Sequence, residues 1–135
     1  RGRRVVTAGR TDRAAGTDVV RIGTWSRSVT RGGQAAVDRC GPATLMWGPW
    51  PPAEPGAHLA TWLAGHSNCG FGWWATLPLG TEVTLSGAQG DATYVVVDRT
   101  WVPRKSGSAD GLIHDLTLQT CEGRGTTLVY ATRIR

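Results

Sequence analysis

Leu112-Ile-His-Asp-Leu-Thr-Leu-Gln-Thr-Cys121 and Thr126-Thr-Leu-Val-Tyr-Ala-Thr-Arg-Ile134 are two β-rich segments separated by Glu122-Gly-Arg-Gly125. Because a short glycine-containing turn joins them, we expect a β-hairpin. Side chains alternate between the two faces of a strand, so the face that carries the leucines of the first segment is expected to join the core. Its final cysteine then lies on the opposite, polar face, open to a groove, where a structural cysteine is less common.

Further short β-rich segments precede this hairpin. The strand candidates are Asp18–Ile22, His58–Ala64, Glu82–Ser86 and Thr93–Val97. Residues 23–57 are rich in Gly, Pro and Trp, and we expect no central strand or helix interior there. Helix signals are weak, with a turn or two at Gly33–Arg39 and Gly72–Leu77. Six or more strands with few helices predict a mainly β fold, either a closed barrel or a sandwich, and a barrel removes exposed strand edges.

The composition indicates one small folded domain. The 135 residues fit a single modest core, and no apolar run reaches the ~18 residues that span a membrane. Five of the fifteen Lys and Arg residues lie in the first thirteen positions, which predicts a flexible basic arm over residues 1–17 and a folded domain over 18–135. Charge in that domain is nearly balanced, so nucleic-acid binding is not expected. The chain does not start with Met, and a signal or anchor segment before Arg1 is compatible with the sequence.

The chain has three cysteines, of which Cys40 and Cys69 lie in loop-like sequence. A disulfide between them would close a loop of about 30 residues and stabilise the fold by roughly 3–4 kcal/mol. Such a bond suits a small extracellular domain, and three free thiols are the alternative. No two cysteines have the spacing of a zinc site, so we expect no metal and no cofactor, although a Ca²⁺ modulator stays open.

The remaining cysteine, Cys121, has a candidate partner in His66, which ends the apolar run Leu59–His66, 55 residues upstream (121 − 66). A thiol is only a few per cent ionised at neutral pH, and an adjacent imidazole can hold it as the thiolate that attacks carbonyls. His114 lies seven residues before Cys121 on the same strand, roughly 23 Å away at ~3.3 Å per residue, and His58 lies at the wrong end of its strand. The pair predicts a cysteine acyltransferase, and a chance occurrence of one Cys and one His is the plainer alternative.

The order of the motifs resembles that of a sortase. These are Gly65-His66, Phe71 and Leu77, Leu79-Gly-Thr-Glu-Val83, the Tyr-Val-Val-Val run that starts at Tyr94, Leu116-Thr-Leu-Gln-Thr-Cys121 and a closing Val-Tyr-Ala-Thr run. Sortases have a strand ending in Ala-Gly-His, a Phe-x-x-Leu element, a Leu-x-x-Gly-Asp-x-Val turn and a Leu-x-Thr-Cys strand. Thr81 stands here where Asp is usual. The resemblance covers residues 18–134 and is to class E/F-like sortases of the actinobacterial type.

The resemblance implies a thiol-dependent peptidase and transpeptidase on a closed β-barrel of about eight strands with short helices or 3-10 turns. Sortases are secreted and held at the extracellular face of the cell membrane in Gram-positive bacteria. Such an enzyme cleaves a Leu-Pro-x-Thr-Gly-like sorting motif in a surface protein. The thioacyl intermediate is then transferred to an amine nucleophile on a peptidoglycan precursor or a pilin.

The resemblance also implies roles for single residues. Cys121 is the expected nucleophile, and His66 is the expected general acid for the leaving amine and base for the incoming one. Thr120 stands where the family often has a threonine that lines the substrate site.

A third family residue, an arginine near the start of the closing strand that contacts the substrate or the oxyanion, is not matched. Thr126 occupies that position, and the nearest cation is Arg124, two residues earlier, which we take as the candidate. Arg99 or Arg104 would supply the group from a separate segment, and Arg133 lies too far along the strand. The plainer alternative is that Arg124 is a solvated turn residue.

Seven tryptophans are many for this length, and Trp73 and Trp74 follow the His66 loop. They either fill a small core or form a wall of the substrate groove, because indole rings bury much area and tolerate a wet edge. Two rival functions stay open. An L,D-transpeptidase also places His before Cys, but it expects Ser-His-Gly-Cys where this chain has Leu-Gln-Thr-Cys. A secreted β-barrel module that stacks exposed Trp on wall sugars would need no reactive thiol.

Overall fold

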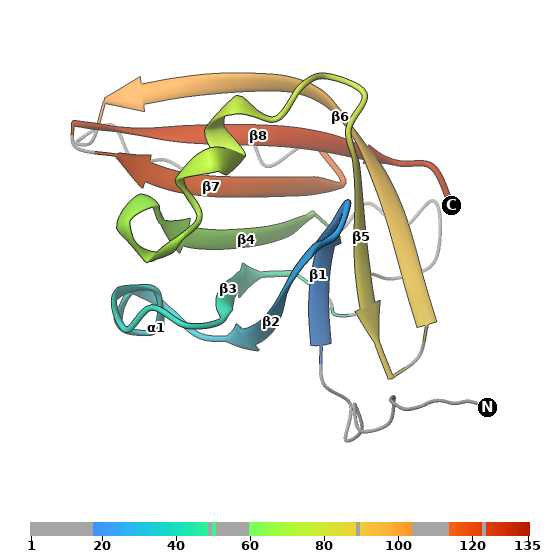
Figure 1. The fold of residues 1–135 in the computed structure, drawn as a ribbon, viewed down its shortest axis with the longest axis horizontal. Coiled ribbons are helices and arrows are strands. Elements are labelled where there is room, and N and C mark those ends of the chain that lie inside the picture. The colour runs from blue at the N-terminus through green and yellow to red at the C-terminus, as the bar shows by residue number, and fades with distance from the viewer. Residues whose placement is uncertain (1–17, 49, 51–59, 89, 104–113, 123) are drawn as a thin grey trace.

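The computed structural model describes residues 18–48, 50, 60–88, 90–103, 114–122 and 124–135. Eight strands close into one barrel in the order β1-β2-β3-β4-β7-β8-β6-β5 (Figure 1). The strands are β1 Asp18–Ile22, β2 Trp25–Arg31, β3 Ala43–Trp47, β4 Thr61–His66, β5 Glu82–Gly87, β6 Gly90–Pro103, β7 Leu116–Glu122 and β8 Gly125–Arg133. The short helices are α1 Gln34–Asp38 and the 3-10 helices η2 Ser67–Cys69 and η3 Gly72–Thr76. The predicted mainly β, closed barrel with short helices is confirmed.

Residues 23–57 differ from the expectation, because β2 and β3 both lie within this stretch. The prolines that argued against strands all fall outside the two strands. β2 and β3 run parallel, with Val29 opposite Ala43. A parallel pair needs a crossover connection, and α1 lies in that connection.

Several sequence predictions fall partly or wholly outside the described residues. These are the basic arm over 1–17, the start of the strand predicted from His58, the proline-rich stretch after Gly48, Arg104, and the start of the strand predicted from Leu112. The strand predicted over His58–Ala64 is observed as Thr61–His66.

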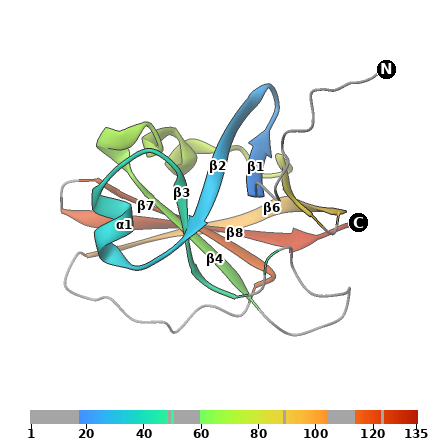
Figure 2. The ribbon, with the colours of Figure 1, turned by 90° about the horizontal axis from the view of Figure 1, so that it is seen from below.

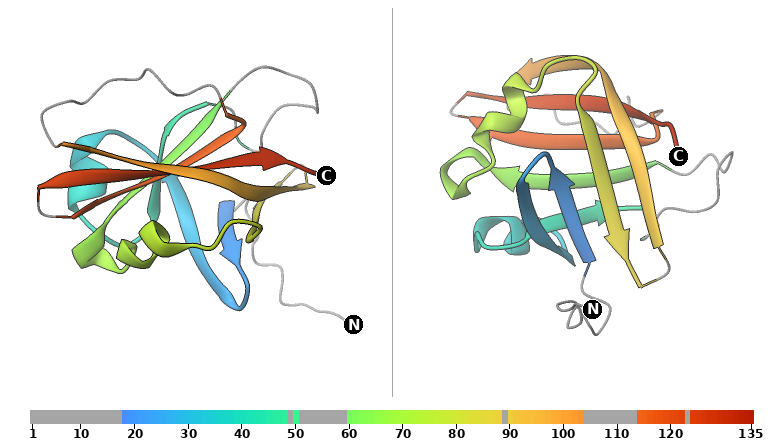
Figure 3. Two further views of the ribbon diagram at one scale, coloured as in Figure 1. Left: turned by 90° about the horizontal axis from the view of Figure 1, so that it is seen from above. Right: turned by 45° about the vertical axis from the view of Figure 1, so that its right-hand side comes forward.

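The barrel interior is filled by apolar side chains from the strands and by an aromatic plug from the segment between β4 and β5. Phe71, Trp74 and Leu77 of this segment are buried in the same core cluster as Leu63 and Leu118. The segment runs across the end of the barrel beside β7 and β8 (Figure 3). Because it continues directly from β4, it fixes where β4 ends.

The β7–β8 hairpin has the predicted alternation. Leu116 and Leu118 are fully buried, whereas Cys121 is half-buried on the other face. The side chains on that face therefore lie on the outside of the barrel. Figure 2 shows α1 at the end of the barrel where β4 and β7 finish, with the C-terminus at the opposite end.

Candidate active site

His66 and Cys121 are paired residues on neighbouring parallel strands. β4 and β7 are in register from Thr61 opposite Leu116 through to His66 opposite Cys121. Neighbouring strands lie about 4.8 Å apart, and directly paired residues project from the same face of a sheet. The imidazole and the thiol, 55 residues apart in sequence, therefore share the outer face at the same strand ends.

Gly65 allows the ring of Phe71, five residues after His66, to pack against the end of β4. The position faces the barrel interior, and a Cβ there would clash with the ring of Phe71. Without a side chain at Gly65, that ring lies against the backbone of β4. Arg27 also lies over this ring, with its guanidinium carbon 4.7 Å from the ring centroid. The segment that follows His66 is thus held by packing of Phe71 against β4 and Arg27.

The Cys121 thiol has two polar neighbours on the outer face. Gln119 Nε2 donates to Sγ at 3.7 Å, and Thr126 Oγ1 lies 3.6 Å from Sγ. Trp62 Nε1 donates to Gln119 Oε1 at 2.9 Å, which holds the amide with its N–H groups toward the sulfur. An N–H donor stabilises negative charge on an acceptor, so Gln119 is a functional candidate. The sequence placed Gln119 on the face of Cys121 but assigned it no role.

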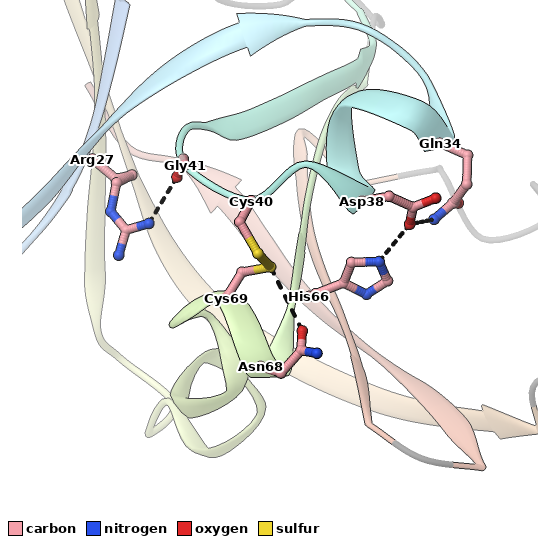
Figure 4. Close-up of a disulfide and its surroundings, with 8 residues drawn as sticks. All are labelled: Arg27, Gln34, Asp38, Cys40, Gly41, His66, Asn68 and Cys69. Atoms are coloured by element: carbon pink, nitrogen blue, oxygen red, sulfur yellow. Dashed lines mark hydrogen bonds and ion pairs between the residues drawn. A yellow bond between two sulfur atoms is a disulfide. The ribbon is translucent and has the colours of Figure 1, made fainter.

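His66 is hydrogen-bonded to Asp38 of α1. His66 Nε2 lies 2.7 Å from Asp38 Oδ1, and Gln34 Nε2 donates to the same oxygen at 2.9 Å (Figure 4). The hydrogen bond from His66, followed by the one from Gln34, lowers the pKa of the Asp38 carboxyl. No sequence pattern indicated Asp38, because its approach to His66 depends on closure of the barrel and not on a local pattern.

A disulfide joins Cys40 to Cys69, with the two Cα atoms 5.2 Å apart. It links the chain just after α1 to η2, which follows His66 directly (Figure 4). Arg27 Nη1 also donates to the carbonyl of Gly41 at 2.7 Å. Helix α1, which carries Asp38, is therefore fastened to the segment that follows His66.

Of the arginine candidates, Arg124 lies exposed in the turn between β7 and β8. Thr126 is the residue directly opposite Cys121. Arg99 Nη1 donates to the carbonyls of Ala75 and Leu77 at 3.0 and 2.8 Å, so its guanidinium holds the end of the η3 segment. Arg133 is paired with Tyr94 at the far end of β8. Arg124 remains the candidate cation nearest to Cys121 in sequence.

Of the three residues expected to bind substrate, two are buried inside the barrel and one is partly exposed. Thr120 is fully buried, because the same alternation that puts Cys121 outside puts Thr120 inside the barrel. Trp74 is also fully buried and packs on Phe71 with ring centroids 4.9 Å apart, so it belongs to the core and not to a groove wall. Trp73 is partly exposed, packs edge-on against Trp25 and donates to the carbonyl of Gly70. Only Trp73 of the three presents a surface to solvent.

Across the described ranges, no cluster of three or more His, Cys, Asp or Glu residues is arranged to hold a metal ion. Among those same residues no helix has the length and apolar character needed to cross a membrane.

The closed eight-stranded barrel with short helices is similar to the fold of known sortase structures. The pilus-related sortase C of Group B Streptococcus superimposes with a TM-score of 0.71 at 18% identity, over 90% of this chain and 69% of that chain. Sortase C-1 from Actinomyces oris gives 0.73 at 19% identity, over 87% and 73%. Sortase A from Corynebacterium diphtheriae gives 0.70 at 17% identity, over 89% of this chain but only 61% of its own. No family model and no curated protein matches the chain.

Proposed function

We propose that this chain is a cysteine transpeptidase of the sortase type. The observation that carries the proposal is the register of the parallel pair β4–β7, which places His66 opposite Cys121. Cys121 is also the one cysteine that the disulfide leaves free. A thiol and an imidazole on one outer face, beside a hydrogen-bond donor from Gln119, are the groups that acyl transfer through sulfur requires.

The proposed reaction has two balanced steps. The Cys121 thiolate attacks a peptide carbonyl, a C–S bond forms and the C–N bond breaks, while His66 as imidazolium gives its proton to the leaving amine. In the second step the imidazole takes a proton from an incoming amine. That amine attacks the thioester, the C–N bond forms and sulfur leaves as the thiolate. Neither step needs a metal, an oxidant or a cofactor.

Donors near Cys121 would stabilise the charge that develops on the carbonyl oxygen. Thr126 supplies a hydroxyl next to the sulfur. We propose Arg124 as the cationic contact, because it lies two residues before Thr126 in the same turn. Trp73 is proposed as a substrate contact, since it is the partly exposed ring in the segment that follows His66.

The proposed substrate is a surface protein with a Leu-Pro-x-Thr-Gly-like motif, and the proposed acceptor is the amine of a peptidoglycan precursor or a pilin. The proposed location is the extracellular face of the cell membrane of a Gram-positive bacterium, with residues 18–135 as the catalytic domain of a class E/F-like enzyme. The Cys40–Cys69 disulfide supports an oxidising compartment, because disulfides are rare in the cytosol.

A peptide cleavage and transfer assay tests the proposal. The chain is incubated with a quenched Leu-Pro-x-Thr-Gly peptide and an amine acceptor, and intact mass is recorded to detect a thioacyl adduct on Cys121. Cys121→Ala and His66→Ala should abolish transfer. His114→Ala is the matched control, because His114 stacks on Tyr130 at the other end of the β7–β8 pair. A folded wild-type chain that forms neither adduct nor product over a panel of sorting peptides would instead favour a wall-binding module.

A further inference from the structure

The contact between His66 and Asp38 is not needed to write the reaction above, yet it is a short, direct contact to the catalytic candidate His66. His66 Nε2 lies 2.7 Å from Asp38 Oδ1 (Figure 4). The Asp38 side chain is 56% exposed and that of His66 is 23% exposed. Ion pairs this exposed contribute little to stability. Fold stability is therefore a weak reason for the His66–Asp38 contact. Orientation and protonation of the His66 imidazole are a stronger one.

A carboxylate can only accept hydrogen bonds, so the charge state of Asp38 dictates the protonation of the facing ring nitrogen. The pKa of Asp38 is lowered, first by the hydrogen bond from His66 and then by that from Gln34, which keeps the carboxyl ionised at neutral pH. His66 Nε2 must then carry a proton. In the neutral ring the lone pair is on Nδ1, and no hydrogen bond to Nδ1 is made by the part of the chain that the structure describes.

The position of Asp38 is itself fixed by several contacts. Ala36 and Val37, the two residues before it in the chain, are buried and anchor α1 to the barrel. Gln34, one turn earlier, donates to Asp38 Oδ1. Cys40, two residues after Asp38, is bonded to Cys69, three residues after His66. The carboxylate and the imidazole thus sit on either side of one covalent link, which limits how far they can separate.

We propose that Asp38 is the positioning residue for His66: it holds the imidazole as the Nε2–H tautomer and leaves Nδ1 to exchange the proton with the leaving and incoming amines. This inference rests on the proposed transpeptidase function for its catalytic meaning. Its geometric part, the tautomer, does not depend on any activity. Asp38 touches no reacting atom and acts through the ring.

The tautomer is tested in the whole chain by NMR with ¹⁵N-labelled histidine at alkaline pH, where imidazoles are neutral. The His66 signals are identified by their loss in His66→Ala. We expect wild-type His66 to be mostly the Nε2–H form. Asp38→Ala removes the oxygen that accepts from Nε2–H, so the Nε2–H form should lose its excess and the share of the Nδ1–H form should rise. The matched control is Glu82→Gln, which removes the same charge from an ion pair with Arg135 that is similarly exposed and lies on other elements.

The second arm is the peptide transfer assay. Asp38→Ala should lower kcat about 10- to 100-fold while KM stays within about two-fold, because the bound state needs no oriented proton donor and the reacting state does. Asp38→Asn should lower kcat less than Asp38→Ala, since its amide oxygen can still accept from His66 Nε2–H and from Gln34. Glu82→Gln should leave both constants unchanged.

The outcomes separate the inference from the proposed function. A His66 tautomer that is the same in wild type and Asp38→Ala overturns the inference, and so does an Asp38→Ala kcat within two-fold of wild type. A wild-type chain with no transfer activity whose His66 still changes tautomer in Asp38→Ala defeats the proposed function but supports the positioning role.

Discussion

Thr126 lies directly opposite Cys121 across the β7–β8 hairpin, with its hydroxyl oxygen 3.6 Å from the sulfur. The sortase pattern places an arginine at this position, so a neutral hydroxyl here replaces a charged, forked donor. A hydroxyl can donate to the thiolate or to a carbonyl oxygen but adds no positive charge. A cationic contact to the substrate must therefore come from a residue other than Thr126. The prediction for Arg124 follows from this.

Arg124→Ala is expected to lower transpeptidation about 10²- to 10³-fold, the usual cost of removing a donor to a developing oxyanion. Arg124→Lys should recover only part of the rate, because the charge is kept and the planar fork is lost. Thr126→Ala should cost less than Arg124→Ala. Activity of Arg124→Ala within a few-fold of wild type would reject the assignment.

Arg99→Ala separates a structural arginine from a catalytic one. Its guanidinium binds the carbonyls of Ala75 and Leu77, so we expect the variant to lose thermal stability, with any activity loss following the loss of folded protein. Differential scanning calorimetry beside the transfer assay measures both. Full stability with a large loss of kcat would mean that Arg99 serves the reaction.

Gln119→Leu is expected to slow alkylation of Cys121 by iodoacetamide at neutral pH, because the thiolate loses an N–H donor. Trp62→Phe removes only the bond that orients the amide, so its effect should be in the same direction and smaller. The rates are measured by intact mass over time. A Gln119→Leu rate equal to or above that of wild type would show that the contact does not support the thiolate.

Titration of Asp38 reports its contact with His66 directly. The folded pKa lies below the usual 3.8, so the hydrogen bonds to the Asp38 carboxylate contribute stability that is present above about pH 4 and is lost as the pH falls through the folded value. In His66→Ala the pKa of Asp38 should rise toward 3.8, and in Gln34→Ala it should rise less, since the hydrogen bond from His66 has the larger effect. Carboxyl ¹³C shifts followed against pH measure this. An Asp38 midpoint unmoved by His66→Ala would contradict the contact.

The disulfide should be visible without reductant, when intact-mass analysis after alkylation is expected to show one modified thiol, Cys121. Replacing Cys40 and Cys69 together by Ser should lower the free energy of unfolding by about 3–4 kcal/mol on the chain-entropy account. Denaturant titration measures the difference. Three modified thiols in the protein without reductant would show that Cys40 and Cys69 are not disulfide-bonded.

Gly65→Ala tests whether the turn after His66 is set by packing. The added methyl would meet the ring of Phe71, and overpacking of this kind costs about 1–3 kcal/mol. Gly33→Ala is the control, because nothing lies within 4 Å of a Cβ there, and we expect a cost of less than about 1 kcal/mol. Equal stabilities of the two variants would show that position 65 can accommodate a side chain.

Features that depend on a period of two residues could be predicted from the sequence. The alternation in β7 placed Leu116 and Leu118 in the core and Cys121 outside, and the glycine turn after it gave the hairpin. The same alternation, continued two residues beyond Leu118, buries Thr120, which the family resemblance had assigned to the substrate site. At Thr120 the strand alternation predicted the burial correctly, and the family resemblance did not.

Features created by closure of the barrel could not be predicted. β2 carries several polar residues and becomes a strand because β1 and β3 pair with it on either side. Trp73 and Trp74 are neighbours with the same chemistry, and only the path of η3 decides that one is exposed and the other is core. Asp38 meets His66 across 28 residues of sequence, a separation at which no periodicity can signal contact.

The parallel pairing of β4 with β7 also has a kinetic consequence. Parallel pairs are non-local, and the chain must close the long loop between His66 and Cys121 before any of their contacts form. Neither strand can reach this register through a simple hairpin, so a partly folded chain would hold the thiol without its imidazole. Imidazole-dependent reactivity of Cys121 would then appear late in refolding. After dilution from denaturant, recovery of this reactivity would report completion of the barrel. Recovery of β-structure measured by circular dichroism would report it less closely.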